Sequence, residues 1–476
     1  MKEYKCRKYD ICVIGAGAGG LSVAAAASGF GLKVALVEGH KMGGDCLNYG
    51  CVPSKSLLSS AKHYYEIKKS EQYGFESEAK SVEIKNVMAK VSEVIANIAP
   101  HDSVERFKGL GVSVYQGFGS FDKADIVKVD NQLIKAKYFV IATGSKPVIP
   151  PIPGISDVNY LTNETIFDLG ETPKHLLVIG GGPIGCELAQ AFLMLGIKVT
   201  LFSHSQILPK DELDLVGMLR QNMLNIGLNL YEDIKLVKLV NLGSDIGVVI
   251  EVDGVEQTIT GSHLLVATGR KPDLDKLNLE AANVKYTNRG IETDECLRTT
   301  NKKIFAIGDS VGGYLFTHIA SYHAGIVIRN IVFKQRAKVN YQALPWVTYT
   351  YPELAHVGLL EREAKVKYAG NITISEFEYS ENDRAQAERA TAGKIKLITT
   401  KNGKVLGVSI LGASAGDLLY PWIDLINRGD TVKAITNNII PYPTLGEINK
   451  QVVGEYYKPI LFSRKVRWLV KFLKFF

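Results

Sequence analysis

The hydrophobic pattern near the N-terminus alternates short apolar runs with a run of small residues. Tyr9 to Ile14 is predicted to be a short strand, and Leu21 to Ala27 a helix that follows a turn of glycines. A second apolar strand is predicted over Lys33 to Val37. The order of strand, glycine-rich turn, helix and strand predicts an α/β nucleotide-binding unit.

The glycines of this turn have the spacing that a bound dinucleotide requires. Gly15 permits a tight turn, Gly17 lets the backbone approach a pyrophosphate, and Gly20 lets the helix pack on the strand. The helix N-terminus adds amide donors and the positive end of a dipole. Glu38 follows the second strand, where its carboxylate can accept hydrogen bonds from a ribose. The glycines alone are weak evidence, but together with Glu38 they predict a dinucleotide site.

The same pattern occurs a second time. An apolar strand over His175 to Ile179 leads into a glycine turn, a helix from Cys186 to about Gly196, and a strand over Lys198 to Phe202. The glycines of the second turn are Gly180, Gly182 and Gly185. Two copies predict two bound dinucleotides. A flavin that stays bound and a nicotinamide that exchanges with solvent would fit the two sites.

The second copy differs from the first at the end of its second strand. Ser203 and His204 stand where Glu38 closes the first copy, and Lys210 is nearby. An acid at this place favours the free 2′-hydroxyl of NAD, so its absence favours NADPH. The alternative is that these are solvated loop residues and that the enzyme uses either NADPH or NADH.

Composition narrows the class of protein. A chain of 476 residues with 46% hydrophobic and 22% charged residues predicts a folded protein of two to four domains. The absence of a secretory signal and of any apolar run of about 18 residues or more predicts a cytoplasmic protein. The six cysteines form no CxxC pairs, so no metal-binding residues are predicted. The body is near neutral, so nothing favours nucleic acid as a partner.

Two cysteines lie just downstream of the first nucleotide fingerprint. Cys46 and Cys51 follow the glycines at Gly43 and Gly44, and Pro53 then enters a predicted helix. Cysteines at a helix N-terminus have stabilised thiolates. In a reducing compartment a disulfide is more often catalytic than structural. The alternative reading is that these are two unrelated buried cysteines.

The segment from Gly43 to Lys55 strongly resembles the redox-active disulfide segment of the pyridine nucleotide-disulfide oxidoreductases, the family of dihydrolipoamide dehydrogenase, glutathione reductase and mercuric reductase. Further motifs occur in the family order over residues 8–460. The resemblance implies that the first copy binds FAD and the second binds NAD(P)H. The cofactor-binding residues that it implies are Gly15, Gly17, Gly20, Glu38, Gly44, Lys55, Ala142, Thr143, Gly144, Gly180, Gly182, Gly185, Ser203, His204, Gly269, Asp309 and Thr317.

The resemblance also implies the architecture. The fold class is α/β, with two Rossmann-like dinucleotide-binding domains, the NAD(P) domain inserted in the FAD domain, and a C-terminal α+β dimerisation domain. The predicted parts are 1–151 and 272–338 for FAD, 152–271 for NAD(P), 339–462 for dimerisation of a homodimer, and 463–476 as a basic tail. Pro345 to Glu353 is predicted to be the opening strand of the dimerisation domain.

By the same resemblance, electrons pass from NAD(P)H through FAD to the Cys46–Cys51 disulfide and then to an acceptor. Cys51 is expected to lie against the flavin, and Cys46 is expected to be the interchange thiol that faces the acceptor. Lys55, one helical turn after Cys51, is expected to contact the flavin and to pair with Glu187. An ammonium there stabilises negative charge on the reduced flavin.

The family pattern breaks near the C-terminus. Tyr442 occupies the place of the family's catalytic histidine, with Glu447 following, and no histidine occurs after His356. A tyrosine, with an ordinary pKa of about 10, is a poor base near neutral pH. Mercuric reductases resemble this chain in having tyrosine there, but they also have a C-terminal cysteine pair, and this chain has no cysteine after Cys296. The alternative is that Tyr442 only packs at the dimer interface.

Asp45 is a second departure, since many relatives have threonine there. A carboxylate beside a pyrophosphate is unfavourable unless it caps a helix, so Asp45 is expected to cap the following helix.

The last residues have the composition of an interfacial membrane helix. The net charge of +7 falls to +1 without the six basic residues after Glu455. On a helix, Arg464, Arg467, Lys471 and Lys474 fall on one side, Trp468, Leu469, Phe472, Leu473 and Phe476 on the other, and Lys465 is the exception. The pattern predicts peripheral contact with a membrane on its cytoplasmic face. The alternative is that the helix packs on its own dimer.

The leading hypothesis is therefore an FAD-dependent NAD(P)H oxidoreductase, mercuric reductase-like, whose acceptor is a metal ion, a quinone or a small disulfide. A dihydrolipoamide dehydrogenase is the alternative enzyme. A membrane-recruited, redox-sensing flavoprotein is the alternative from another class.

Overall fold

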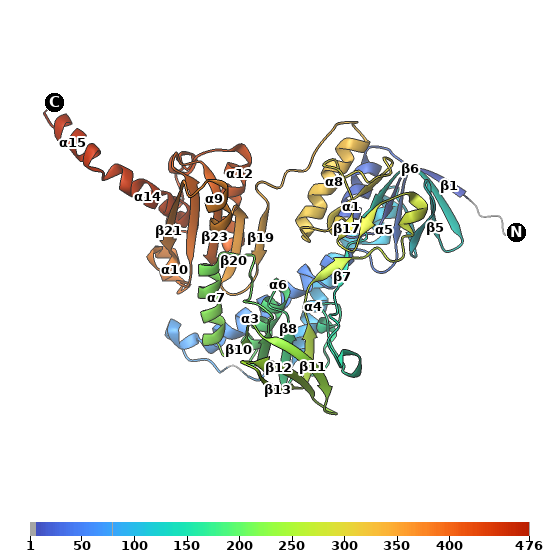
Figure 1. The fold of residues 1–476 in the computed structure, drawn as a ribbon, viewed down its shortest axis with the longest axis horizontal. Coiled ribbons are helices and arrows are strands. Elements are labelled where there is room, and N and C mark those ends of the chain that lie inside the picture. Colours follow the sequence, from blue (N-terminus) through green and yellow to red (C-terminus); the bar gives the residue numbers. More distant parts are fainter. Residues whose placement is uncertain (1–5, 79, 476) are drawn as a thin grey trace. The chain divides into compact units, whose positions relative to one another are not determined.

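The computed structural model describes residues 6–78 and 80–475, and the chain folds into two compact units. The first unit comprises residues 1–180 and 236–339, and the second comprises residues 181–235 and 340–476 (Figure 1). Both mix helices and strands, so the predicted α/β fold class is confirmed. The predicted five-part division of the chain stays a prediction.

A seven-stranded sheet is the centre of the first unit. Its order is β3-β2-β1-β6-β5-β4, and β18 pairs with the end of β6. The strands are β1 (Cys6–Ile14), β2 (Val34–Glu38), β3 (Ser113–Gln116), β4 (Gly119–Lys123), β5 (Ile126–Val129), β6 (Gln132–Ile141) and β18 (Ile304–Ala306). The strands β3, β2, β1, β6 and β18 are parallel, and β4 and β5 form an antiparallel hairpin.

Side chains alternate between the two faces of this sheet along each strand, and both faces are buried in a core. In β1, Ile11 and Val13 enter one core cluster while Cys12 and Ile14 enter another. The helices α1 (Ala18–Gly29) and α8 (Thr317–Ile331) pack together over the first cluster. The small residues of α1 allow this close approach.

The described residues of the first unit also form four smaller strand groups, one of which is the antiparallel pair β16 (Tyr286–Thr287) and β17 (Gly290–Ile291). Strands β7 (Ser145–Pro147) and β15 (Arg270–Pro272) pair antiparallel, and β8 (His175–Ile179) and β14 (His263–Val266) pair parallel. The fourth group is β11 (Lys235–Asn241), β12 (Ile246–Val252) and β13 (Val255–Gly261). The short helix α2 (Gly44–Asn48) is followed along the chain by α3 (Cys51–Lys68) and α4 (Ile84–Ile98). The helices α3 and α4 pack on each other.

The second unit contains a five-stranded antiparallel sheet with the order β19-β20-β23-β22-β21. Its strands are β19 (Pro345–Thr348), β20 (Glu353–Gly358), β21 (Ile372–Glu378), β22 (Lys394–Thr400) and β23 (Val405–Gly412). The prediction of a single strand over Pro345–Glu353 is wrong, since this stretch contains all of β19 and only the start of β20. The chain turns between them, so the two strands pair with each other.

Helices cover this sheet. The core of the unit contains Trp422 of α12 (Tyr420–Arg428), whose ring N–H donates to Asn449 of α14 (Glu447–Leu461) at 2.7 Å. The second unit also contains the helices α6 (Pro183–Met194), α7 (Leu213–Asn225), α9 (Glu361–Lys367), α10 (Asp383–Ala387) and α15 (Arg464–Leu473). The strands β9 (Lys198–Phe202) and β10 (Asn229–Tyr231) form a parallel pair in the same unit.

Candidate functional site

The two glycine turns have the same local geometry. Gly15 and Gly180 have φ of 104° and 125°, and a methyl group on either would overlap the carbonyl oxygen of Ala142 or Ala267. Those two alanines donate backbone hydrogen bonds of 2.8 Å to the ends of β1 and β8. Each first glycine of a turn therefore lies against an Ala-Thr-Gly segment, residues 142–144 for Gly15 and residues 267–269 for Gly180, and the repeat predicted from the sequence is present in the structure.

The helix starts also match. Gly17 precedes α1 with φ −81° and ψ −175°, and Gly182 precedes α6 with φ −79° and ψ 179°. Gly20 is buried in α1, where a methyl group would overlap the carbonyl oxygen of Gly15, and Gly185 is buried in α6. Each turn thus places a glycine, which has no side chain, directly before the first turn of a helix. A pyrophosphate can then approach the backbone amides at the helix N-terminus.

The residues around the first turn fit a flavin dinucleotide. Glu38 accepts hydrogen bonds of 2.6 Å from the backbone N–H groups of Ala16 and His40, so its carboxylate is held at the end of β2. The hydroxyl oxygen of Thr143 is buried without a hydrogen-bond partner among the described residues. A buried polar atom of this kind needs a partner, which a polar cofactor can supply. Gly144, the next residue, has φ of 72°.

Asp309 lies in the same unit, after β18. Its carboxylate accepts a hydrogen bond of 2.5 Å from the Ser145 hydroxyl, and burial raises its pKa. The ribityl contact that the resemblance implies for Asp309 stays a prediction.

The dithiol segment rests directly on the first glycine turn. The backbone N–H of Gly43 donates to the carbonyl of Ala16 at 2.9 Å, and a methyl group on Gly44 would collide with Gly17. Cys46 lies inside α2, and Cys51 is the first residue of α3. The sequence predicted a bend between Gly44 and the helix that begins at Cys51. The structure has the short helix α2 in this stretch.

Two helix N-termini meet at Cys51. Its sulfur lies 3.2 Å from the hydroxyl oxygen of Thr317, the first residue of α8, so the positive ends of α3 and α8 both face it. The hydrogen bond from Cys46 lowers the pKa of Cys51 to about 6, with further lowering from Thr317 and Lys55. The same hydrogen bond raises the pKa of Cys46, with burial as the second cause. The two shifts favour negative charge on Cys51 and the proton on Cys46 in the reduced pair.

Lys55 lies one turn along α3, as predicted from the spacing. Its ammonium donates to the Ser54 hydroxyl at 3.3 Å. Glu187 is buried in α6 of the second unit, where it accepts a hydrogen bond of 2.8 Å from the backbone N–H of Tyr349. The pairing of Lys55 with Glu187 stays a prediction.

The expectation that Asp45 caps a helix is wrong. Neither α2 nor α3 has a side-chain cap, and the Asp45 carboxylate instead forms an ion pair of 3.0 Å with Arg270. It also accepts a hydrogen bond of 3.3 Å from Asn163. The carboxylate bonds the Arg270 guanidinium instead of the helix amides, because a guanidinium offers a stronger, charge-assisted bond.

Tyr442 lies in the loop before α14 and is 70% exposed. Its hydroxyl donates to the carboxylate of Asp383 in α10 at 2.8 Å, and this bond raises the pKa of Tyr442. Glu447, the first residue of α14, instead accepts a hydrogen bond of 3.5 Å from the backbone N–H of Thr444. Sequence reasoning missed Asp383, since no local pattern relates residues 59 positions apart.

The residues predicted to choose between NADPH and NADH differ in exposure. Ser203 is buried against Gly181, while His204 and Lys210 are exposed. Gly269 has φ of 125° and lies just before Arg270. An exposed histidine and lysine are compatible with a 2′-phosphate, and the preference for NADPH stays a prediction.

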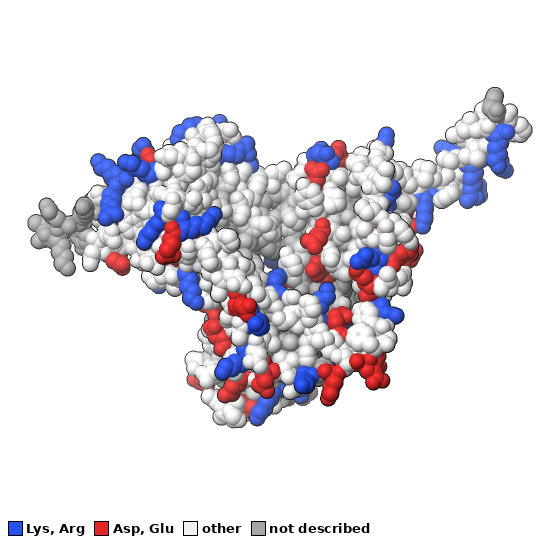
Figure 2. All heavy atoms as spheres, turned by 180° about the vertical axis from the view of Figure 1, so that it is seen from behind, with Lys and Arg blue, Asp and Glu red and all other residues white. Residues whose placement is uncertain are grey.

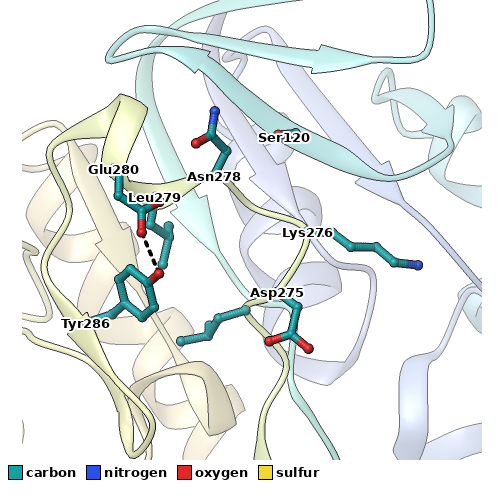
Figure 3. A pocket seen from close by; sticks show the side chains of 8 residues that line it. Ser120, Asp275, Lys276, Asn278, Leu279, Glu280 and Tyr286 are labelled. Atoms are coloured by element: carbon teal, nitrogen blue, oxygen red, sulfur yellow. Dashed lines mark hydrogen bonds between the residues drawn. The ribbon is translucent and has the colours of Figure 1, made fainter.

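A cavity of about 500 Å³ lies elsewhere in the first unit (Figure 3). Its lining residues are Ser120, Leu274, Asp275, Lys276, Asn278, Leu279, Glu280 and Tyr286. The Tyr286 hydroxyl donates to Glu280 at 2.6 Å across one side of it. No predicted site residue lines this cavity, so it is separate from the dithiol site. Among residues 6–78 and 80–475, no group of three His, Cys, Asp or Glu side chains could hold a metal ion.

Known proteins resemble this chain over nearly its whole length. The family model for pyridine nucleotide-disulphide oxidoreductases matches residues 9–324, and that for the family's dimerisation domain matches residues 344–453, which supports a homodimer. A mercuric reductase of Staphylococcus aureus is 34% identical over 92% of this chain and 81% of that protein. A dihydrolipoyl dehydrogenase of Geobacillus stearothermophilus is 35% identical over 92% of this chain and 94% of that protein.

The fold also matches a solved structure. The HOCl-induced flavoprotein disulfide reductase RclA from Escherichia coli superposes with a TM-score of 0.85 at 24% identity, over 94% of this chain and 99% of that one. The two glycine turns, the dithiol segment, the dimerisation domain and the relatives all indicate the same family. The chain belongs to the pyridine nucleotide-disulfide oxidoreductase family and is an NAD(P)H-dependent FAD disulfide oxidoreductase.

Proposed function

We propose that this enzyme is mercuric reductase-like and passes electrons from its dithiol to a metal ion, a quinone or a small disulfide other than lipoamide or glutathione disulfide. The observation that carries the proposal is Tyr442, which replaces the family's histidine and whose hydroxyl proton is directed to Asp383. The relatives do not make this choice, since mercuric reductases and dihydrolipoyl dehydrogenases are 34% and 35% identical to the chain.

The chemistry at Tyr442 opposes a proton relay. Its pKa is raised above the ordinary value of about 10, so at neutral pH it keeps its proton and cannot act as a base. A dithiol that must return protons to a thiol substrate therefore lacks the usual partner. An acceptor that needs electrons, or exchange between thiolates, is less affected.

The dithiol can generate its own nucleophilic thiolate without a histidine. Glu38 and the first amides of α1 would hold FAD, which would supply acceptance of hydride from NAD(P)H and transfer of two electrons to the disulfide. In the reduced pair, the Cys51 thiolate accepts the hydrogen bond from Cys46 and can take its proton. The Cys46 thiolate then attacks one sulfur of a disulfide acceptor, which breaks the acceptor's S–S bond and releases a thiolate. That thiolate takes the proton from Cys51, and the Cys51 thiolate attacks the Cys46 sulfur, which breaks the mixed disulfide and releases the second thiolate. The dithiol is oxidised by two electrons, and the acceptor is reduced by two.

We expect NAD(P)H oxidation to be fast with Hg(II), Cu(II), a quinone or a small disulfide, and slow with lipoamide. Steady-state absorbance of the nicotinamide measures each rate, with NADPH and NADH compared under the same conditions. Turnover with lipoamide alone would overturn the proposal. No turnover with any acceptor would favour the redox-sensing flavoprotein.

The basic tail supports a further part of the proposal, which is peripheral contact with an anionic membrane. Helix α15 follows Ser463, whose hydroxyl accepts a hydrogen bond of 3.4 Å from Val466 N–H. None of the described residues of α15 is buried. Trp468 is 68% exposed, and Phe475, two residues after the helix ends, is 88% exposed. Figure 2 shows Lys and Arg side chains along this helix with no acidic side chain among them. Phe476, predicted for the apolar face, lies outside the described residues.

This arrangement is the one that an interfacial helix requires, with an apolar face for the acyl boundary and cations for the headgroups. Each basic residue adds about 1 kcal/mol of attraction to an anionic surface. No helix of residues 6–78 and 80–475 is long and apolar enough to cross a membrane.

Co-sedimentation with vesicles tests the tail. We expect the full chain to bind vesicles of phosphatidylcholine with phosphatidylglycerol more than phosphatidylcholine alone, and a chain that ends at Phe462 to bind neither. A full-length Arg467→Glu, Lys471→Glu variant keeps the apolar face and should lose the preference for anionic lipid. Equal binding of the full and shortened chains, with a weaker dimer in the latter, would show that the helix packs on its own dimer.

A further inference from the structure

Asp45, the residue directly before Cys46, forms an ion pair with an arginine, Arg270, that is largely covered by the protein. The side chain of Arg270 is 11% exposed, while that of Asp45 is 38% exposed. Their ion pair is 3.0 Å long, and Asn163 donates to the same carboxylate oxygen at 3.3 Å and to the carbonyl of Tyr49 at 3.3 Å. Both partners hold the dithiol segment from outside it, Asn163 at two points.

Arg270 is itself fixed in place. Its guanidinium donates to the hydroxyl and to the backbone carbonyl of Ser145, each at 2.8 Å. The Ser145 hydroxyl in turn donates to Asp309 at 2.5 Å. Strands β7 and β15 bring Ser145 and Arg270 together, since they pair antiparallel. A continuous set of charge-assisted hydrogen bonds therefore runs from the dithiol segment through Arg270 to Asp309.

We propose that Asp45 and Arg270 are positioning residues that hold the dithiol turn and balance the charge beside its two thiols. This role goes beyond the choice of acceptor. It concerns the state of the thiols before any acceptor arrives.

The charges around the thiols give the two residues opposite effects. The groups that face Cys46 and Cys51 are Asp45 on α2, Lys55 on α3 and Thr317 on α8, with Arg270 behind Asp45. Asp45 raises the pKa of both thiols, whereas Lys55 lowers the pKa of Cys51. Without the carboxylate, the thiols lose a repelling charge and Arg270 is left unpaired, and both changes favour thiolate. Without the guanidinium, the carboxylate acts unopposed and disfavours thiolate.

The test is alkylation of the reduced holoenzyme by iodoacetamide across a range of pH, with mass spectrometry to separate Cys46 from Cys51. We expect Asp45→Asn to move the half-point of alkylation to lower pH by about one unit, and Arg270→Gln to move it to higher pH. Arg270→Lys, which keeps the charge, should leave it near the parent value. The double variant Asp45→Asn, Arg270→Gln should also return toward the parent value.

Asp125→Asn is the matched control, because Asp125 forms an exposed ion pair with Lys135 and should shift nothing. A purely structural role would move both single variants in the same direction or neither, and either result would overturn the proposal. If Arg270→Gln fails to retain flavin, the test uses Asp45→Asn and Asp45→Thr without it. A pH of half-maximal alkylation that is unchanged in both variants would contradict the proposal. The measurement uses no acceptor, so it succeeds or fails independently of the proposed function.

Discussion

Cys46→Ser should abolish transfer to any acceptor while leaving NAD(P)H able to reduce the bound flavin. A hydroxyl cannot form the disulfide or act as the interchange nucleophile, so we expect acceptor turnover to fall by roughly 10³-fold or more. Reduction of the flavin precedes the dithiol and should keep its rate in stopped-flow absorbance. The contrast between the two rates is the diagnostic result.

Cys6→Ser is the matched control, since Cys6 is an exposed free cysteine at the start of β1. It should change neither rate. Unimpaired turnover of a thiol-dependent acceptor by Cys46→Ser would remove the assignment of Cys46. Loss of flavin reduction as well would mean that the substitution damages the nucleotide site.

Gly20→Ala should yield a protein with little bound flavin. The new methyl group would overlap the carbonyl oxygen of Gly15, which is backbone and cannot rotate aside. Overpacking of this kind costs about 1–3 kcal/mol, and here it acts on the turn that must approach a pyrophosphate. We expect the flavin-to-protein absorbance ratio to fall to a small fraction of the parent value and the melting temperature to drop.

Gly29→Ala provides the control in the same helix. No atom lies within 4 Å of a methyl group placed there, and the residue ends α1. Flavin content should be unchanged, and stability should rise by about 0.5–1 kcal/mol or stay level. A Gly20→Ala protein with full flavin content would contradict the assigned role of the first turn.

Much of the site was predictable because its parts are local. The glycine spacing, Glu38 and the dithiol each lie within a few residues of one element, and the chain folds both glycine turns in the same way. The helix starts at Ala18 and Pro183 and the strand at His175 are close to the predicted bounds. The predictions that failed depend on contacts beyond a single element. In the stretch Pro345–Glu353, the pairing of β19 with β20 divides a continuous β pattern into two strands.

The sequence by itself determined the family, the two dinucleotide turns and the redox dithiol, since backbone sterics at glycine and the position of a thiol at a helix start are local properties. Only the tertiary structure decided the partners of the two unusual residues. Asp45 binds Arg270, 225 positions away, and Tyr442 binds Asp383, 59 positions away. Charge-assisted hydrogen bonds of this kind depend on which strands and helices the fold places side by side, and no periodicity in the chain encodes that.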